Sequence, residues 1–293
     1  MTSTTPGAGT TPGGAGGAGT PGVGDGAGAT PGVTSTAAGV GDGADWWATG
    51  ISDIAPGVIR FRGYAIEELI GEVSFAQMVW LMTRGELPSA GEARLLELTL
   101  VAAVDHGPQA PSIAAARMAA SCGLALNNAM ATGVNLLGDV HGGAGQQCLQ
   151  VLYDLGASGQ EPAELVAEYK ERKAFIPGFG HRFHPRDPRR DPLIGAAQQA
   201  VAEGIISGRY VELALALESA LAPIPMNIDG ATATIYAELG FPVPLARGLF
   251  VLSRSVGILA HAYEQSQEPT RIKGPLPKGV LPTYTGTPPR NLT

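Results

Sequence analysis

From Trp46 onward, apolar residues recur every three or four positions, which is the spacing that places them on one face of an α-helix. The clearest example lies in residues 244–264, where Leu245, Leu249, Leu252, Val256 and Leu259 follow at intervals of four, three, four and three. This spacing predicts a buried stripe along a long helix. Further helices are predicted over residues 66–82, 89–105, 111–137, 142–157, 161–172, 189–206, 209–221 and 230–239. Because little of the chain is left to build a sheet, the predicted fold class is all-α.

Two segments depart from this ordinary helical pattern. Residues 57–64 are rich in β-branched and aromatic side chains, which predicts a small β-hairpin near residues 51–62. Residues 111–137 hold eight alanines between positions 114 and 133. We expect them to form one long helix whose small side chains let neighbours approach closely, as a central or intersubunit helix does.

The first 44 residues differ from the rest in composition. They hold fifteen of the 42 glycines, no aromatic residue and no lysine or arginine. Such a segment cannot bury enough apolar surface to offset its ordering entropy, so residues 1–44 are predicted to be a disordered Gly/Ala/Pro/Thr-rich tail. It lacks the basic start of a secretory signal and the arginines of a mitochondrial one, so we expect a cytoplasmic protein.

Charge and cysteine content exclude several classes of protein. The net charge of −7 leaves no basic stripe for a nucleic acid. No run of about 18 apolar residues predicts a membrane span. Two cysteines are too few for a disulfide framework, and no Cys/His spacing predicts a metal site.

Polar residues at the breaks between predicted helices are the candidates for chemistry. His141 precedes two glycines at the opening of a helix, where the helix dipole disfavours an imidazolium and leaves a neutral hydrogen-bond donor. Asp229 opens another helix and suits a general base. The alternative for His141 is a solvated histidine beside a turn, and the alternative for Asp229 is an ordinary N-cap residue. Cys148 is interpreted as a packed structural residue.

The stretch IPGFGHRFHPRDPRR, residues 176–190, holds two of the five histidines and four of the nineteen Lys/Arg residues. Its glycines let the backbone approach a ligand, and its guanidinium groups suit carboxylate or phosphate. A solvated charged loop explains the composition equally well. His106 and Arg254 are further cationic candidates, each with a solvated alternative.

Several stretches together resemble the citrate synthase family. They are RFRGYAIEEL, HGGA, PGFGHR, DPR, NID and SRSVGILAHAYEQ, which occur in that family's order from about Ile51 to the end of the chain. The resemblance implies a two-domain helical fold that works as a homodimer, with residues 45–142 and 241–293 as a large domain and 143–240 as a small one. It also implies an active site in the cleft between the domains. The implied reaction, associated with the tricarboxylic acid cycle, interconverts citryl-CoA with acetyl-CoA and oxaloacetate, with coenzyme A as co-substrate and no permanently bound cofactor.

The resemblance also implies roles for individual residues. His141 matches the histidine that hydrogen-bonds the thioester oxygen, Asp229 the carboxylate that takes the methyl proton, and His181 the histidine that protonates the oxaloacetate carbonyl oxygen. The oxaloacetate-binding residues would be His106, Arg189 and Arg254. Those expected to hold coenzyme A are Lys170, Arg172, Lys173, Pro177, Gly178 and Gly180. This assignment agrees with the chemistry, since removal of a methyl proton needs a base together with stabilisation of the enolate oxygen.

Three features depart from typical citrate synthases. The interval from His181 to Arg189 is one residue shorter, which leaves Arg186 as an alternative to Arg189. The segment between GELP and DHGP is shorter by dozens of residues. The terminal arginine that would reach the partner subunit is replaced by RIKGP, which offers Arg271 or Lys273.

The motifs DHGP and NIDG resemble the citryl-CoA lyase branch, and this sequence holds no ATP-grasp portion. The leading hypothesis is therefore a stand-alone citryl-CoA lyase-like enzyme. A citrate synthase or 2-methylcitrate synthase is the alternative, and a non-catalytic CoA-binding homologue is the second alternative.

Overall fold

The structure is a computed structural model that describes residues 46–269, 272–277 and 279–292. The chain divides into two units, Met1–Ala48 and Thr49–Thr293. The predicted disordered tail lies outside the described residues, and the predicted division of residues 45–293 into a large and a small domain stays a prediction.

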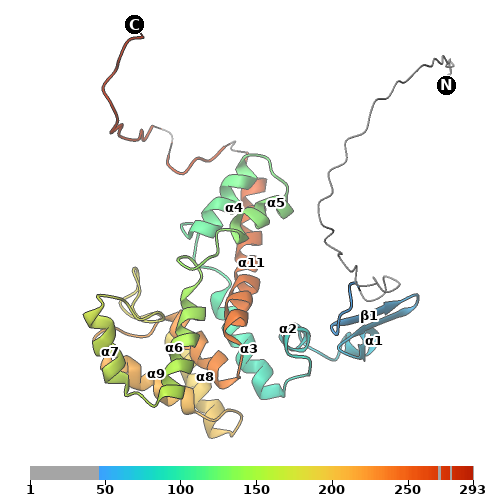
Figure 1. The fold of residues 1–293 in the computed structure, drawn as a ribbon. Helices are drawn as coiled ribbons and strands as arrows, with labels where there is room; N and C mark the ends of the chain where they lie inside the picture. Colours follow the sequence, from blue (N-terminus) through green and yellow to red (C-terminus); the bar gives the residue numbers. More distant parts are fainter. Residues whose placement is uncertain (1–45, 270–271, 278, 293) are drawn as a thin grey trace, which may run out of the picture. The chain divides into compact units, whose positions relative to one another are not determined.

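The second unit begins with a small antiparallel sheet of β1 (Ser52–Ala55), β2 (Val58–Phe61) and β3 (Tyr64–Ala65), in that order (Figure 1). The β1–β2 register pairs Ser52 with Phe61 and Ala55 with Val58, which confirms the predicted hairpin. A two-residue turn joins β2 to β3, and both of its residues, Arg62 and Gly63, have positive φ angles as a type I′ turn requires.

The rest of the described chain is helical, which confirms the predicted fold class (Figure 1). The first helices are α1 (Ile66–Leu69), α2 (Phe75–Arg84), α3 (Ala90–Ala103), α4 (Pro111–Ser121), α5 (Leu126–Val134) and α6 (Ala144–Ser158). They are followed by α7 (Pro162–Glu171), α8 (Arg190–Ala202), α9 (Arg209–Ala220), α10 (Ile228–Glu238) and α11 (Val243–Gln267). Capping boxes begin α2 at Ser74 and α3 at Ser89, so these two starts are encoded locally.

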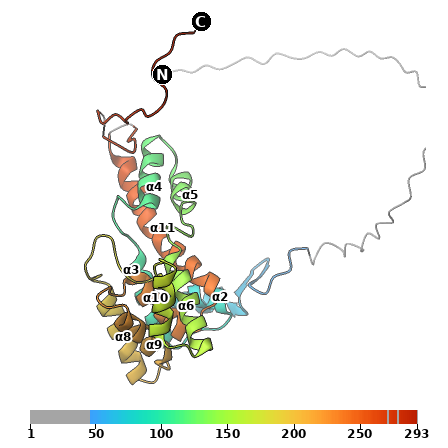
Figure 2. The same ribbon diagram turned by 60° about the vertical axis from the view of Figure 1, so that its left-hand side comes forward.

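The prediction of one helix over residues 111–137 was wrong, because a turn separates α4 from α5. Gly123 has a φ of 88°. The N–H groups of Gly123 and Leu124 donate to the carbonyls of Ala120 and Ala119, at 3.0 and 3.3 Å. These two bonds form a Schellman motif, which ends a helix at a left-handed glycine. The two helices then lie side by side against α11 (Figures 1 and 2).

The predicted buried stripe on α11 was also wrong in part. Leu249 is buried, but Leu252, Val256 and Leu259 are 38%, 58% and 41% exposed. The buried face instead carries smaller or polar residues, among them Ala246, Ser253, Arg254, Gly257 and Ala262. Gly257 lies so close to Val104 and Asp105 that a side chain there would collide with the Val104 carbonyl. Close packing of this helix therefore selects small residues over the leucine stripe.

Helix α11 is long and apolar enough to cross a membrane by length and composition alone, a test that core helices of soluble proteins also pass. It packs along α3, α4, α5 and α6. Helix α10 is the most enclosed, with nine of its eleven residues buried. The main core surrounds α10, and this core fixes the start of the helix, where Asp229 lies.

Candidate active site

Asp229 lies at the start of α10 but is not the N-cap residue of this helix. Asn227 is the N-cap residue, and its Oδ1 accepts the backbone N–H groups of Asp229 and Gly230, at 2.8 and 3.2 Å. The capping interpretation therefore applies to Asn227. Within the described part of the chain, the Asp229 carboxylate accepts no hydrogen bond, which leaves it open to a substrate proton. Burial raises the pKa of this carboxyl, although Arg189 and Arg254 oppose the shift.

The turn Pro177–Gly180 lies against the start of α10. The Gly178 carbonyl accepts the N–H of Asn227 at 3.0 Å, and Gly180 N–H donates to the Pro225 carbonyl at 2.8 Å. Gly178 has a φ of 88°, and a Cβ there would lie 2.6 Å from Cys148 Sγ and 2.8 Å from Gly230 Cα. The glycine at 178 is therefore required by packing against α10. At Gly180 a Cβ would meet only Ile224, at 3.3 Å.

Arg189 is directed into the site by a buried carboxylate, Asp187. The two oxygens of Asp187 accept Nε and Nη2 of Arg189, both at 2.9 Å, and Asp187 also accepts the N–H of Ile228 at 3.0 Å. Burial would raise the pKa of Asp187, but these bonds outweigh it and lower the pKa to about 2. Arg189 is thereby held beside the start of α10, 3.5 Å from His106 Nδ1. Arg186 instead pairs with Asp191 at the surface, so the geometry favours Arg189 over Arg186.

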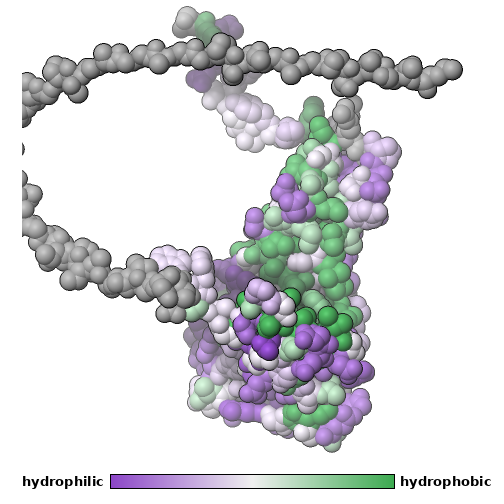
Figure 3. All heavy atoms as spheres, turned by 90° about the vertical axis from the view of Figure 1, so that its right-hand side faces the viewer, coloured by the Kyte–Doolittle hydropathy of each residue, from purple (hydrophilic) through white to green (hydrophobic). Residues whose placement is uncertain are grey.

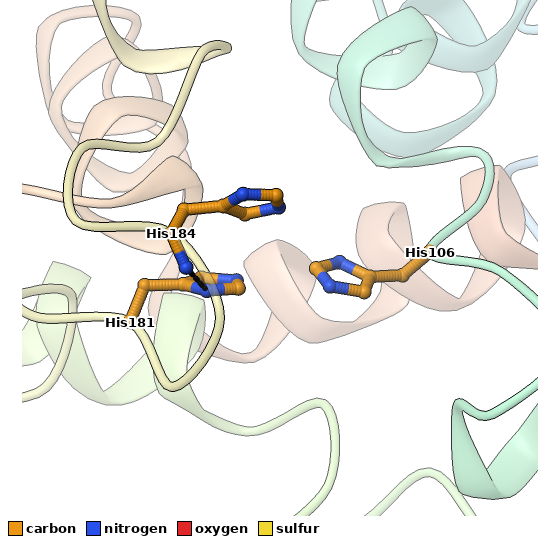
Figure 4. Close-up of side chains that lie close together, drawn as sticks. All are labelled: His106, His181 and His184. Carbon is orange, nitrogen blue, oxygen red and sulfur yellow. Dashed lines mark hydrogen bonds between the residues drawn. The ribbon is translucent and has the colours of Figure 1, made fainter.

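Three histidines from two distant parts of the sequence lie together (Figure 4). The rings of His106 and His181 are stacked, with centroids 5.2 Å apart, and the ring of His184 lies 4.6 Å from that of His181. The Nδ1 atom of His181 accepts the backbone N–H groups of Phe183 and His184, both at 3.1 Å. His181 is therefore neutral with its proton on Nε2. Burial and neighbouring cations lower the pKa of His106, and burial lowers the pKa of His181 despite the opposing charge of Asp187.

His141 is also held neutral. Its Nε2 accepts the backbone N–H of Ser112, in the first turn of α4, at 3.2 Å, and lies 3.0 Å from Ser112 Oγ. The ring proton is therefore on Nδ1, which can donate to a substrate oxygen. Burial, with Arg254 and Arg182 nearby, lowers the pKa of His141. The predicted neutral imidazole therefore has a structural basis, although its partner lies at the start of α4.

Arg254 links these groups electrostatically. Its charge acts on the pKa values of His106, His141 and Asp229, so it lies among all three. Its Nε donates to the Ala103 carbonyl at 3.0 Å and its guanidinium lies 4.8 Å from the centroid of the Phe250 ring. The alternative of a solvated arginine is excluded, because Arg254 is only 4% exposed.

The loop that carries His106 is held by α11. Arg254 bonds to Ala103, Gly257 packs on Val104, and His261 Nε2 lies 3.3 Å from Asp105 Oδ1. Asp105 also accepts the N–H of Gly107 at 3.0 Å. Successive turns of one helix therefore fix the three residues before His106, and Asp105 in turn holds Gly107 after it.

The basic residues expected to hold coenzyme A lie around the end of α7. Lys170 is in its last turn, and Lys173 follows it with a φ of 51°. Arg172 lies over the Tyr169 ring and pairs with Glu168 at 3.1 Å, at the edge of a cavity of about 250 Å³ between α6 and α7. Their role toward coenzyme A, like that of the turn Pro177–Gly180, stays a prediction.

Several residues of the site had no role in the sequence interpretation. Asp187 and Asn227 were inside quoted motifs, but only the fold shows that one orients Arg189 and the other caps α10. Ser112 is distant in the sequence from His141, to which it bonds. His184 had no assigned role. The sequence also predicted no metal site, yet His106, His181 and His184 each offer a ligand atom within 4.8 Å of the others.

The site thus combines a carboxylate of raised pKa, a neutral imidazole donor and a group of cations suited to a small anion. Residues 88–275 match the family model "Citrate synthase, C-terminal domain". The citrate synthase of Haloferax volcanii is 32% identical over 201 residues, covering 66% of this chain and 52% of the relative. The citrate synthase of Mycolicibacterium smegmatis is 30% identical, covering 82% of this chain and 63% of the relative.

A solved structure of citryl-CoA lyase from Hydrogenobacter thermophilus superposes with a TM-score of 0.77 at 35% identity, covering 84% of this chain and 97% of the lyase. Citrate synthase from Thermotoga maritima is also similar, with a TM-score of 0.58 at 27% identity, covering 74% of this chain and 60% of that one. The chain belongs to the citrate synthase family. It spans about half the length of the curated citrate synthase from Haloferax volcanii.

Proposed function

We propose that this protein is a citryl-CoA lyase, which interconverts citryl-CoA with acetyl-CoA and oxaloacetate. The observation that carries the proposal is the grouping of Asp229, His141 and His181 around Arg254 and Arg189, with both histidines neutral and the pKa of Asp229 raised. The similarity to the lyase from Hydrogenobacter thermophilus over 97% of its length supports the lyase direction.

In cleavage, Nε2 of His181, which has given up its own proton as at the end of synthesis, takes the hydroxyl proton of citryl-CoA, and the bond between the acetyl carbon and the oxaloacetate carbon breaks. The electron pair moves onto the thioester, where Nδ1–H of His141 stabilises the enolate oxygen. Protonated Asp229 then donates its proton to the acetyl carbon. The raised pKa of Asp229 favours the protonated form that this step requires.

In synthesis the same protons move in reverse. Asp229 takes the methyl proton, and the enolate attacks the oxaloacetate carbonyl carbon. His181 gives its Nε2 proton to the resulting alkoxide. The ring that remains is stabilised by the two N–H groups that donate to its Nδ1 and by the nearby guanidinium groups. Arg189 and Arg254 supply the charge that binds the two carboxylates.

The fate of citryl-CoA separates this proposal from a citrate synthase, an alternative favoured by the curated relatives of that name. Purified protein is incubated with oxaloacetate and acetyl-CoA, and free CoA and citrate are measured. The lyase is expected to cleave supplied citryl-CoA without net formation of citrate. Release of CoA together with citrate would establish the synthase instead.

A non-catalytic CoA-binding homologue is the second alternative. Asp229→Asn separates it from an enzyme, because the amide cannot take up a proton. Turnover by the wild-type protein that this variant loses, with an unchanged melting temperature or a higher one, supports the enzyme. Absence of turnover in the wild type would favour the binding protein.

We also propose a cytoplasmic homodimer. Leu252, Val256, Leu259 and Tyr263 form an exposed apolar face on α11, and Figure 3 shows hydrophobic residues gathered on that part of the unit. A second copy of the chain would cover this face. Arg271 lies outside the described residues, and Lys273 pairs with Glu268 of its own chain.

Light scattering tests the dimer. Val256→Glu is expected to halve the measured mass, whereas Gln198→Glu, which adds the same charge on the exposed side of α8, is expected to leave it unchanged. A wild-type monomer would contradict this proposal and leave the proposed reaction standing.

A further inference from the structure

The ring of His184 has no role in the mechanism above, although it lies beside two residues that do. Its backbone N–H donates to His181, but its ring nitrogens make no hydrogen bond within the described part of the chain. The ring is half-buried and lies 4.6 Å from that of His181 and 6.1 Å from that of His106, centroid to centroid. Figure 4 shows the rings of His181 and His184 one above the other, both extending toward His106.

The three rings are spaced to hold an oxygen atom. One nitrogen of each lies within 4.8 Å of the others. Three atoms no more than 4.8 Å apart share a central point no more than about 2.8 Å from each, because 4.8 Å divided by √3 is 2.8 Å. An oxygen atom at that point would be within hydrogen-bond distance of all three nitrogens, and a metal ion, which nitrogen ligands bind at about 2.0–2.1 Å, would need the nitrogens closer to its centre.

The tautomers and charges favour an anionic acceptor over a metal ion. His181 carries its proton on Nε2, and His106 Nδ1 faces a guanidinium N–H of Arg189, which places the His106 proton on Nε2 as well. The cluster therefore offers two N–H donors beside an arginine. A metal ion there would meet N–H groups and positive charge.

We propose that His184 is a third substrate-binding donor, whose ring holds the α-keto acid end of oxaloacetate together with His106 and His181. This inference rests on the proposed function and adds a residue to it. His184 would act on the keto acid and leave the thioester unaffected, because its contacts are confined to the His106–His181 side of the site.

Two substitutions separate the ring nitrogens from the shape of the ring. His184→Phe keeps an aromatic ring against His181 and removes both nitrogens, and His184→Gln restores a donor. Both keep the backbone N–H that orients His181. Phe183→Leu is the control, since the ring of Phe183 lies 6.1 Å from that of His181 but offers no donor.

Calorimetric titration gives the dissociation constants for oxaloacetate and for CoA. We expect His184→Phe to weaken oxaloacetate binding about ten- to hundredfold, as loss of a hydrogen bond to a charged group does, with CoA binding unchanged. His184→Gln should recover most of the loss, and Phe183→Leu should bind oxaloacetate as the wild type does. Equal binding by His184→Phe and the wild type would overturn the assignment and leave the proposed function standing. A wild type that binds no oxaloacetate would overturn both.

Zinc ion alone is a second probe that does not depend on activity. We expect dialysed wild-type protein to retain no zinc. Retention of one equivalent by the wild type, lost in His184→Phe, would replace the hydrogen-bonding role with a metal centre.

Discussion

Replacing Gly178 by alanine tests whether the glycine turn is shaped by the fold or by a ligand. The added Cβ would lie 2.6 Å from Cys148 Sγ, 2.8 Å from Gly230 Cα and 3.0 Å from Gly230 N, at a φ of 88°. Gly230 is the residue after Asp229, so the collision falls on the start of α10. Because two of these three contacts are with backbone atoms, a side-chain rotation cannot relieve them.

Two costs add at this position. A non-glycine residue in the left-handed region costs about 1–2 kcal/mol. Forcing an extra carbon into a packed interior costs about 1–3 kcal/mol more. Gly178→Ala is therefore expected to lower the free energy of unfolding by about 2–5 kcal/mol.

Gly180→Ala is the matched control, because Gly180 has a φ of 77° in the same turn but its Cβ would meet only Ile224 Cγ2 at 3.3 Å. It should show the conformational cost alone, about 1–2 kcal/mol. Urea unfolding followed by circular dichroism measures both variants. Equal losses would refute the packing account. So would a Gly178→Ala protein of wild-type stability that had lost affinity for CoA, because the glycine would then serve the ligand.

Three further predictions concern the charged groups. Asp187→Asn should weaken oxaloacetate binding about tenfold by releasing Arg189. The pKa of Asp187 is about 2 in the folded protein and about 3.9 when unfolded. Above pH 4, the free energy of unfolding of the wild type should therefore exceed that of this variant by about 2 kcal/mol. This difference should be lost as pH falls through 2, which acid unfolding measures. The pKa of Asp229 is raised, so kcat/KM for synthesis should rise with pH through a pH above 3.9, the ordinary aspartate pKa. Over the same range kcat/KM for cleavage should fall, because synthesis uses the carboxylate and cleavage uses the protonated acid. Asp229→Asn should unfold at a higher temperature than wild type at neutral pH, since it removes a buried charge, and a lower melting temperature would contradict this. Arg254→Lys should raise KM for oxaloacetate about tenfold, because an ammonium cannot both bond to Ala103 and lie flat over Phe250. The melting temperature should change little. An unchanged KM would contradict the role of Arg254.

The local sequence determined most of the helices and their ends. Periodicity, prolines and glycines placed α3 and α6 to α11 within a few residues, because these signals act within one or two turns. The same level of reasoning picked out His141, Asp229 and the cations of residues 176–190, and the motifs together indicated the family.

Only the tertiary structure decided which faces are buried and what each site residue does. On α11, close approach of residues 103–105 buried the face that carries Gly257 and Arg254 and left Leu252, Val256 and Leu259 exposed, since packing depends on the partner surface. Asp187 could be given its role only once the start of α10 lay against it, and His184 only once its ring lay beside that of His106. Roles of this kind depend on contacts between residues distant in sequence, and the spacing of residues along the chain carries no information about them.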